Sequence, residues 1–415
     1  MQDFSNVLSY FTEHIIEIFK WKKKIEFLDL GQQPLANYYL DKSQINKHEK
    51  KYRLIICFDN QNKLVSIKKT FPSKMMFNNK YPYRSSMSQT MQKSFKKLAQ
   101  QIKKEINPKK ILEIGSNDGS FLKNFNKKIS IGIEPCANVE RITKKKKFNT
   151  IPKYWNIKLA QGIKKKYGSI DLIYSANTIS HIKDLSDVFK SINLVLSEKG
   201  ILILEDPSLL ECLKRNTYDQ FYNEHIYVFS YQSLKNILKK YKFEIYKIDN
   251  LDIHGGSNRY FIKRIINKIK IESSVMAQSK KEISYGLEKK ATYFKFKKRV
   301  EKSKKKLISI FKFCKSKNKK IIGYGATAKS TTILNYCKIN HQMIDYFLDT
   351  TKDKQNKYTP GTKIKIKEYK GGINNDVGYV FLGAWNFKKE IFKKEKKYIK
   401  AGGKFIIHTP FPKII

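Results

Sequence analysis

The feature that most constrains the fold is an alternation of short apolar runs and longer polar stretches between Lys109 and Ile265. The runs are KKILEIG, ISIGIEP, SIDLIYSAN, GILILEDP, FEIYKIDNL and NRYFIKRI. The stretches between them are long enough for crossover helices, which is the signature of a mostly parallel, doubly wound sheet. A second alternation follows in KKIIGYG, MIDYFLD, VGYVFLG and KFIIHTP. We therefore expect an α/β protein with two sheets.

The rest of the chain divides into a small module and a linker. Residues 1–86 hold the strand-like pieces YRLIICF and KLVSIKKTF between turn-forming Gly and Pro, which predicts a β-rich N-terminal module. Apolar residues recur at helical spacing from Ser88 to Glu105. Residues 266–318 are Lys-rich and periodic, which predicts one long helix or a helical pair. The predicted organisation is a module at 1–86, an α/β domain at 87–265, a helical linker at 266–318 and a Rossmann-like domain at 319–415.

Composition excludes several classes of protein. The 85 Lys+Arg and 36 Asp+Glu leave a formal charge of +49, but the lysines are scattered through every segment, as a genome rich in A and T would write them. The five cysteines form no C-x-x-C pair, which argues against a disulfide framework. The N-terminal stretch MQDFSNVLSYFTEHIIEIFK is acidic and has no uninterrupted apolar core, so we expect no secretory signal. No apolar run approaches the roughly 18 residues of a membrane span, and we expect a soluble, cytoplasmic protein.

The strongest local motif, LEIGSNDG at residues 112–119, closes one apolar run and opens a helix. Gly115 and Gly119 allow the turn backbone to approach a ligand, and a helix N-terminus presents free N–H groups. Glu134, in GIEP after the next run, is placed to accept hydrogen bonds from a ribose diol. The combination resembles the S-adenosylmethionine site of class I methyltransferases. A structural turn without a ligand is the alternative.

A second cluster, FYNEHIY at residues 221–227, follows the run that ends at Glu205. His225 can take a proton near neutral pH, Glu224 can orient it, and Tyr222 can donate to a developing oxyanion. The alternative is that these side chains only satisfy one another. His181, after SIDLIYSAN, is expected at the same edge of the sheet, unless it caps a helix.

These motifs and several others resemble one family, the sugar-nucleotide C-methyltransferases, which methylate carbon 3 of a nucleoside-diphosphate 4-keto-deoxyhexose. The resemblance runs in order over essentially the whole chain. It includes LDLGQQPLANYYL, YPYRSS, LEIGSNDGSFL, GIEP, ANTISHI, FYNEHIYVFS, HGGSNR, GYGATAKSTTILNY and a D-x-x-x-x-K...P-G-T element between Asp349 and Thr362.

The N-terminal module departs from the family pattern. Members of the family carry two C-x-x-C pairs that bind a structural zinc. Here the first pair is absent near Lys22 to Ile25, and the second survives only as Cys57 with Asn60 in the partner position. Because thiolates hold such a zinc, we expect no metal, and the module must be held by packing.

The resemblance also implies roles for particular residues. The cofactor pocket is lined by Glu113, Gly115, Asn117, Asp118, Gly119, Glu134 and Asn177. The sugar is surrounded by Tyr222, Glu224, His225 and His181, with Tyr81 or Tyr83 reaching over from the N-terminal module. The nucleotide lies near His254, Gly255, Gly256, Ser257 and Arg259, and Gly325, Lys329 and Ser330 are further candidates for phosphate binding. His225 is the expected base at the carbon beside the ketone, with Glu224 supporting it and Tyr222 or an N-terminal Tyr donating to the enolate oxygen.

Three other functions remain open. The chain could methylate oxygen or nitrogen of another small molecule. The charge and the Lys runs at 144–147 and 304–306 suggest a nucleic-acid-binding protein or RNA methyltransferase, although no aromatic and basic RNA module accompanies them. The lost zinc ligands suggest a non-catalytic descendant, although both motifs keep the residue types that chemistry needs. We expect a nucleotide-sugar substrate, no nucleic-acid or membrane partner, and a monomer.

Overall fold

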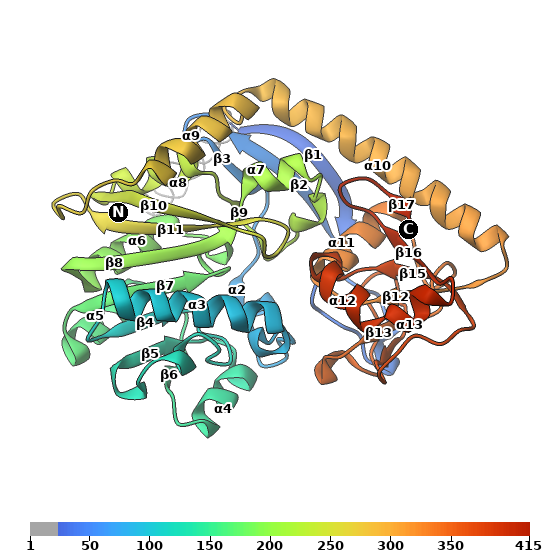
Figure 1. The fold of residues 1–415 in the computed structure, drawn as a ribbon, viewed down its shortest axis with the longest axis horizontal. Helices are drawn as coiled ribbons and strands as arrows, with labels where there is room; N and C mark the ends of the chain where they lie inside the picture. Colours follow the sequence, from blue (N-terminus) through green and yellow to red (C-terminus); the bar gives the residue numbers. More distant parts are fainter. Residues whose placement is uncertain (1–23) are drawn as a thin grey trace, which may run out of the picture.

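The computed structural model describes residues 24–415. They form three β-sheets, and the small sheet with the N-terminal strands lies across the junction between the two larger sheets (Figure 1). The stretch examined for a secretory signal, and Lys22 and Lys23 at the position of the first missing cysteine pair, lie outside the described residues. Within 24–415, none of the helices has the length and apolar character needed to cross a membrane.

The first sheet combines the N-terminal module with a later segment. Its strands, in spatial order, are β1 (Lys24–Gln33), β2 (Tyr52–Asp59), β3 (Leu64–Ile67) and β9 (Tyr227–Val228). The edge strand β9 begins at Tyr227, the last residue of the cluster FYNEHIY, and the backbone N–H of Ile67 donates to the carbonyl of Ile226 at 2.9 Å. The module is therefore hydrogen-bonded to the loop that carries the candidate catalytic residues.

The second sheet has seven strands and confirms the predicted doubly wound architecture. In spatial order they are β10 (Phe243–Leu251), β11 (Ser257–Arg264), β8 (Leu196–Pro207), β7 (Ile170–Ala176), β4 (Ile111–Ile114), β5 (Ser130–Ile133) and β6 (Asn149–Ile151). All neighbouring pairs from β8 to β6 are parallel, whereas β11 runs antiparallel to both of its neighbours. The carboxyl ends of β4, β5 and β7 therefore meet at one edge of the sheet.

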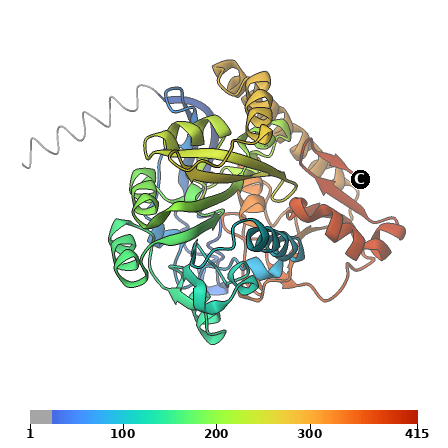
Figure 2. The same ribbon diagram turned by 60° about the vertical axis from the view of Figure 1, so that its left-hand side comes forward.

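Helices cover both faces of this sheet (Figure 2). One face packs on α5 (Ile157–Tyr167), α6 (Leu185–Val195) and α8 (Tyr231–Lys239), and the other on α3 (Gln89–Glu105). The short helices α2 (Ser73–Met76), α4 (Ala137–Lys145) and α7 (Leu209–Lys214) lie in the connections. The helix predicted at residues 88–105 is confirmed: the Ser88 side chain caps α3, and the face with Met91, Phe95 and Leu98 is buried.

The third sheet belongs to the C-terminal region. Its strands, in spatial order, are β14 (Ile366–Glu368), β13 (Phe347–Asp349), β12 (Lys320–Tyr324), β15 (Val377–Leu382), β16 (Lys404–Ile407) and β17 (Lys413–Ile414). All pairs are parallel except β16 with β17. The helices of this region are α11 (Ala328–Cys337), α12 (Lys388–Lys394) and α13 (Lys396–Lys400). The four predicted strands are present, and β14 and β17 are additions that the sequence pattern did not reveal.

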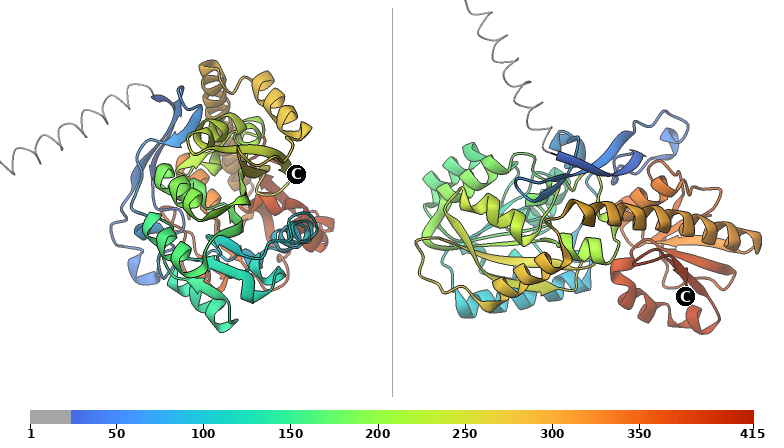
Figure 3. Two further views of the ribbon diagram at one scale, coloured as in Figure 1. Left: turned by 90° about the vertical axis from the view of Figure 1, so that its left-hand side faces the viewer. Right: turned by 90° about the horizontal axis from the view of Figure 1, so that it is seen from above.

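The linker is a helical pair, α9 (Ser273–Tyr285) and α10 (Lys290–Ser316), separated by Gly286 in the left-handed conformation. Seen from above, α10 and the N-terminal strands both run across the junction between the two α/β sheets (Figure 3). Phe27 and Phe58 of those strands pack on Tyr293 of α10, with ring centroids 5.0 and 4.3 Å apart. Cys57 of β2 is buried, and no three His, Cys, Asp or Glu side chains of residues 24–415 lie close enough together to hold a metal ion. Aromatic packing on α10 thus adds to the pairing of β3 with β9 in joining the module to the rest of the protein.

Candidate active site

The turn after β4 needs both of its glycines. Gly115 has φ +78°, and a Cβ there would lie 2.1 Å from the Thr178 hydroxyl. Gly119 has φ +77° and would meet the Phe148 ring at 3.3 Å. These constraints keep the backbone of the turn close to the neighbouring β7 loop, where Asn177 adopts φ +50°. Gly115 and Asn177 line a large cavity at this edge of the sheet, whereas Gly119 lies behind it.

Two buried carboxylates stand beside the turn. Glu134, at the end of β5, accepts the backbone N–H of Asn117 at 3.0 Å and that of Cys136 at 2.8 Å. Glu113, on β4, has one carboxylate oxygen without a hydrogen-bond partner. Burial raises the pKa of both groups, and for Glu134 the two backbone donors act in the opposite direction. Both residues and Asn117 line the cavity, so acceptors are available there for the donors of a ligand.

Asp118 has a different place in the same turn. Its carboxylate accepts the backbone N–H of Ser86 at 3.1 Å and the hydroxyl of Ser120 at 2.6 Å. It is not part of the cavity wall. Asn117 accepts the N–H of Ser85, so the segment that carries Tyr83 is fastened over the turn.

The Tyr222 and His225 side chains form a tight pair at the centre of the cavity. The Nδ1 atom of His225 lies 2.8 Å from the carbonyl oxygen of Gln220, to which only an N–H can donate. The Nε2 atom therefore carries the lone pair, and the Tyr222 hydroxyl donates to it at 2.6 Å. Burial lowers the pKa of His225 well below its ordinary value, so the imidazole is neutral at pH 7.

His181 completes this pair from the β7 side. Its ring stacks on that of His225 with centroids 4.9 Å apart, and on Phe77 at 5.5 Å. Burial lowers the pKa of His181 to about 3, and its Nε2 atom has no hydrogen-bond partner. The structure thus brings His181, Tyr222 and His225 together, and all three line the cavity.

Glu224 makes its hydrogen bonds away from His225. Its carboxylate accepts the Asn37 side-chain amide at 2.8 Å and also pairs with the Tyr81 hydroxyl. Burial raises the pKa of Glu224 to about 7, against these two hydrogen bonds, which lower it. Glu224 faces a small side pocket of about 40 Å³ on the far side of Tyr81, so the structure shows no direct support of His225 by this acid. Tyr81 lines both pockets, and Tyr83, 40% exposed, lines the large cavity.

The HGGSNR segment contributes one residue to the cavity. His254 lines it. Gly255 and Gly256 are needed for close packing, because a Cβ on them would lie 2.2 Å from the Trp385 ring and 2.6 Å from Glu211. Ser257 bonds the carbonyl of Ile253 within the fold. Arg259 also leaves the expected set, because its guanidinium is paired with the buried Glu205 at 2.8 Å and is not part of the cavity wall.

The C-terminal domain forms the other end of the cavity. Lys329 reaches into it from the first turn of α11, and burial lowers the pKa of its ammonium to about 8. Gly325 lies at the wall, whereas Ser330 caps the helix with Thr327. Lys354, which sequence reasoning did not assign to the site, also lines the cavity and lies 3.5 Å from Asp349. Its position in the D-x-x-x-x-K element was the available signal.

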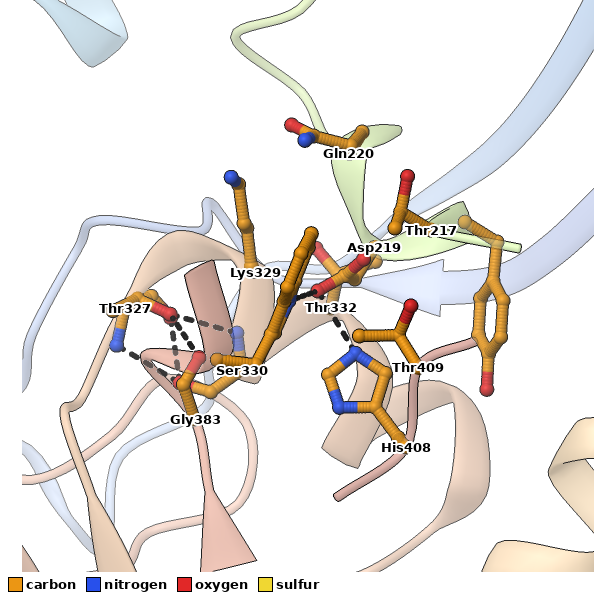
Figure 4. A network of polar contacts seen from close by, with 12 residues as sticks. Thr217, Asp219, Gln220, Thr327, Lys329, Ser330, Thr332, Gly383, His408 and Thr409 are labelled. Atoms are coloured by element: carbon orange, nitrogen blue, oxygen red, sulfur yellow. Dashed lines mark hydrogen bonds and ion pairs between the residues drawn. The ribbon is translucent and has the colours of Figure 1, made fainter. Parts of the chain in front are cut away.

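A buried network near this end was also missed. Asp219, three residues before Tyr222, contacts His408 and Trp385 of the C-terminal domain, and Lys329 stands beside them (Figure 4). These residues are distant in the sequence, so no spacing could have connected them. The cavity as a whole measures about 700 Å³ and runs from Glu134 past His225 to Lys329.

Two family models match consecutive parts of the chain. Residues 83–248 match the methyltransferase domain family, and residues 252–410 match the C-methyltransferase C-terminal domain family. The C-methyltransferase NovU of Streptomyces niveus is 28% identical over 307 residues, which are 74% of this chain and 73% of NovU. A solved methyltransferase of Thermotoga maritima is 20% identical, with a TM-score of 0.33, over 41% of this chain and 89% of its own. The PH0226 protein of Pyrococcus horikoshii is 16% identical, with a TM-score of 0.35, over 44% and 94%.

Proposed function

We propose that this chain, an S-adenosylmethionine-dependent C-methyltransferase by its two domain families, methylates carbon 3 of a nucleoside-diphosphate 4-keto-deoxysugar. The observation that carries the proposal is the single cavity that joins three kinds of subsite. It has carboxylates at the cofactor end, a neutral histidine in its middle and lysines at the C-terminal end. A substrate that fills it must have a carbon acid in the middle and an anionic group some distance away.

The cofactor end fits S-adenosylmethionine. Gly115 and Glu113 line this end of the cavity, and one oxygen of the buried Glu113 carboxylate has no hydrogen-bond partner within the protein. Glu134 stands where it can accept ribose hydroxyls. When bound there, S-adenosylmethionine supplies an electrophilic methyl group on a sulfonium.

Transfer to carbon requires a base, because a carbon beside a ketone becomes nucleophilic only after its proton leaves. His225 has the form that a base needs: neutral, with Nδ1–H held by Gln220 and the lone pair on Nε2. In the structure that lone pair accepts the Tyr222 hydroxyl. If the ketone oxygen of the substrate takes over the Tyr222 donor, the same change stabilises the enolate and frees Nε2 for the carbon-bound proton.

The C-terminal end suits the nucleoside diphosphate. Lys329 and Lys354 lie on its wall together with Lys394, and the backbone at the start of α11 presents N–H groups beside Lys329. Binding energy from this remote group holds the sugar over His225, which is what the transfer step needs. This proposal replaces Arg259 with Lys329 and Lys354 as the phosphate-binding cations.

The test is solvent deuterium incorporation at carbon 3 of a thymidine-diphosphate 4-keto-deoxysugar, with S-adenosylhomocysteine bound so that transfer cannot follow. We expect wild-type protein to exchange this proton and the His225→Asn variant to exchange it about 10²- to 10⁴-fold more slowly. Equal S-adenosylhomocysteine affinity of the two proteins is the control. Methylation of an oxygen or nitrogen needs no carbon acid, so methyl transfer without any exchange would refute the proposal.

A further inference from the structure

The loop that carries the candidate base is attached to the C-terminal domain through one carboxylate. Asp219 is fully buried, and it belongs to the short turn Tyr218–Gln220 that leads into Tyr222 and His225. Asp219 is not part of the cavity wall, and its carboxylate points toward His408 of the C-terminal domain (Figure 4). A buried carboxylate is stable only when it is well paired.

Both partners of Asp219 come from the C-terminal domain. The indole N–H of Trp385 donates to its Oδ2 atom at 2.6 Å, and Nε2 of His408 lies 3.0 Å from the same oxygen. Burial opposes ionisation of Asp219, but His408, Lys329 and Trp385 together outweigh it and lower its pKa. The carboxylate is therefore charged at neutral pH, and its two hydrogen bonds are of the stronger, charge-assisted kind.

The residue next to Asp219 holds the base. The carbonyl of Gln220 accepts Nδ1–H of His225, and the Gln220 side-chain amide donates to the carbonyl of His254. Trp385 touches both parts of this arrangement, because its ring lies against Gly255 while its N–H holds Asp219. Gln220 therefore lies between two segments that Trp385 contacts, Asp219 through its N–H and Gly255 through its ring.

We propose that Asp219 is a positioning residue through which the C-terminal domain sets the tautomer of His225. With Asp219 fixed, the Gln220 carbonyl points at Nδ1 and keeps the proton there, so that the lone pair stays on the catalytic side of the ring. With Asp219 released, the carbonyl is free to turn and the Nε2–H tautomer becomes accessible. The inference rests on the role proposed for His225 and gives the C-terminal domain a part in proton removal as well as in substrate binding.

The test compares four variants with the wild type, all with the remainder of the chain unchanged. Asp219→Ala removes the acceptor for both C-terminal donors, whereas Asp219→Asn keeps an oxygen that can accept them. Thr409→Val is the matched control, because Thr409 follows His408 and makes another hydrogen bond across the junction, to the carbonyl of Arg215 at 2.7 Å. Trp385→Phe removes the N–H donor together with part of the ring that lies against Gly255, and it serves if Asp219→Ala does not fold.

Two readouts are needed. The first is the ¹⁵N spectrum of histidine-labelled, ligand-free protein, in which the His225 signal is identified with His225→Asn and reports the tautomer directly. It requires no substrate, so it tests the anchor even if the proposed sugar is wrong. The second is the rate of substrate proton exchange, set against S-adenosylhomocysteine affinity.

We expect Asp219→Ala to mix the two tautomers and to slow exchange about 10- to 100-fold, with cofactor affinity unchanged. Trp385→Phe should shift the tautomer in the same direction. Asp219→Asn and Thr409→Val should resemble the wild type. An unchanged His225 tautomer in every folded variant of Asp219 and Trp385 would overturn the proposal. So would an equal slowing by Thr409→Val, since that would trace the effect to domain docking in general.

Discussion

Replacement of Glu134 by Gln is expected to lower both the stability of the protein and its affinity for the cofactor, and the two effects can be measured separately. One oxygen of the Glu134 carboxylate accepts the N–H of Asn117, and the other accepts the N–H of Cys136. An amide offers a single acceptor, so one buried N–H faces another donor, which costs about 1–3 kcal/mol of stability. Hydrogen bonds to charged groups contribute about 1.5–3 kcal/mol against about 0.5–1.5 for neutral ones. We expect each ribose hydroxyl to lose about 1–2 kcal/mol, or roughly 5- to 30-fold in Kd.

Calorimetric titration with S-adenosylmethionine and S-adenosylhomocysteine measures the affinity, and thermal unfolding without ligand measures the stability. Asp118→Asn is the matched control, because Asp118 also accepts a backbone N–H in this turn but is not part of the cavity wall. We expect it to lower stability and leave Kd close to that of the wild type. The reasoning is refuted if Glu134→Gln binds as tightly as the wild type, or if Asp118→Asn weakens binding equally, since the loss would then come from the turn and not from a ribose contact.

The other predictions concern the pair at the centre, the phosphate end and the N-terminal module. Tyr222→Phe should lower turnover about 100-fold, because it removes the donor to the enolate oxygen, while S-adenosylhomocysteine binding stays unchanged; equal turnover would exclude that role. Because the pKa of Lys329 is about 8, its ammonium loses its proton between pH 7 and 9. Affinity for thymidine diphosphate should fall over that range, and Lys329→Met should remove this dependence. Phe58→Ala should cost about 3–5 kcal/mol of unfolding free energy, as a buried ring stacked on α10, whereas Phe313→Ala, at a side chain that is 50% exposed, should change it by no more than about 0.5 kcal/mol. A chelator should leave the unfolding temperature unchanged, because Cys57 belongs to no metal-binding group within residues 24–415; a fall of several degrees would contradict this.

The strands of the N-terminal module are held by packing and by strand pairing. The sequence predicts the loss of the zinc ligands and leaves open what holds the strands. The structure answers with two contacts that lie far apart along the chain, the aromatic stack of Phe58 on Tyr293 and the pairing of Val65 with Val228. The second contact fastens the module to the segment that carries His225. Both contacts join the module to the rest of the protein without a metal ligand taking part.

Local sequence patterns predicted most of the secondary-structure elements and the motifs that they carry. Apolar runs and helical spacing predicted most strands of both α/β sheets and helix α3, because hydrophobic periodicity is written in consecutive residues, whereas the short strands β6, β14 and β17 were missed. The same holds for the glycines of the cofactor turn, whose positive φ angles follow from the LEIGSNDG segment. It also holds for the cluster of Tyr222 with His225, which are close in sequence and remain close in space.

Tertiary structure decided which side chains face the cavity and which ones hold the fold together. Arg259 pairs with Glu205 and Glu224 turns to Asn37, although motif position placed both at the substrate. Asp219 and His408 are 189 residues apart and meet only because two domains dock. A sequence gives the type of each polar group but not its partner. A buried polar group loses its hydrogen bonds to water and must find a donor or acceptor in the protein. Which donor or acceptor lies within reach depends on the folded chain.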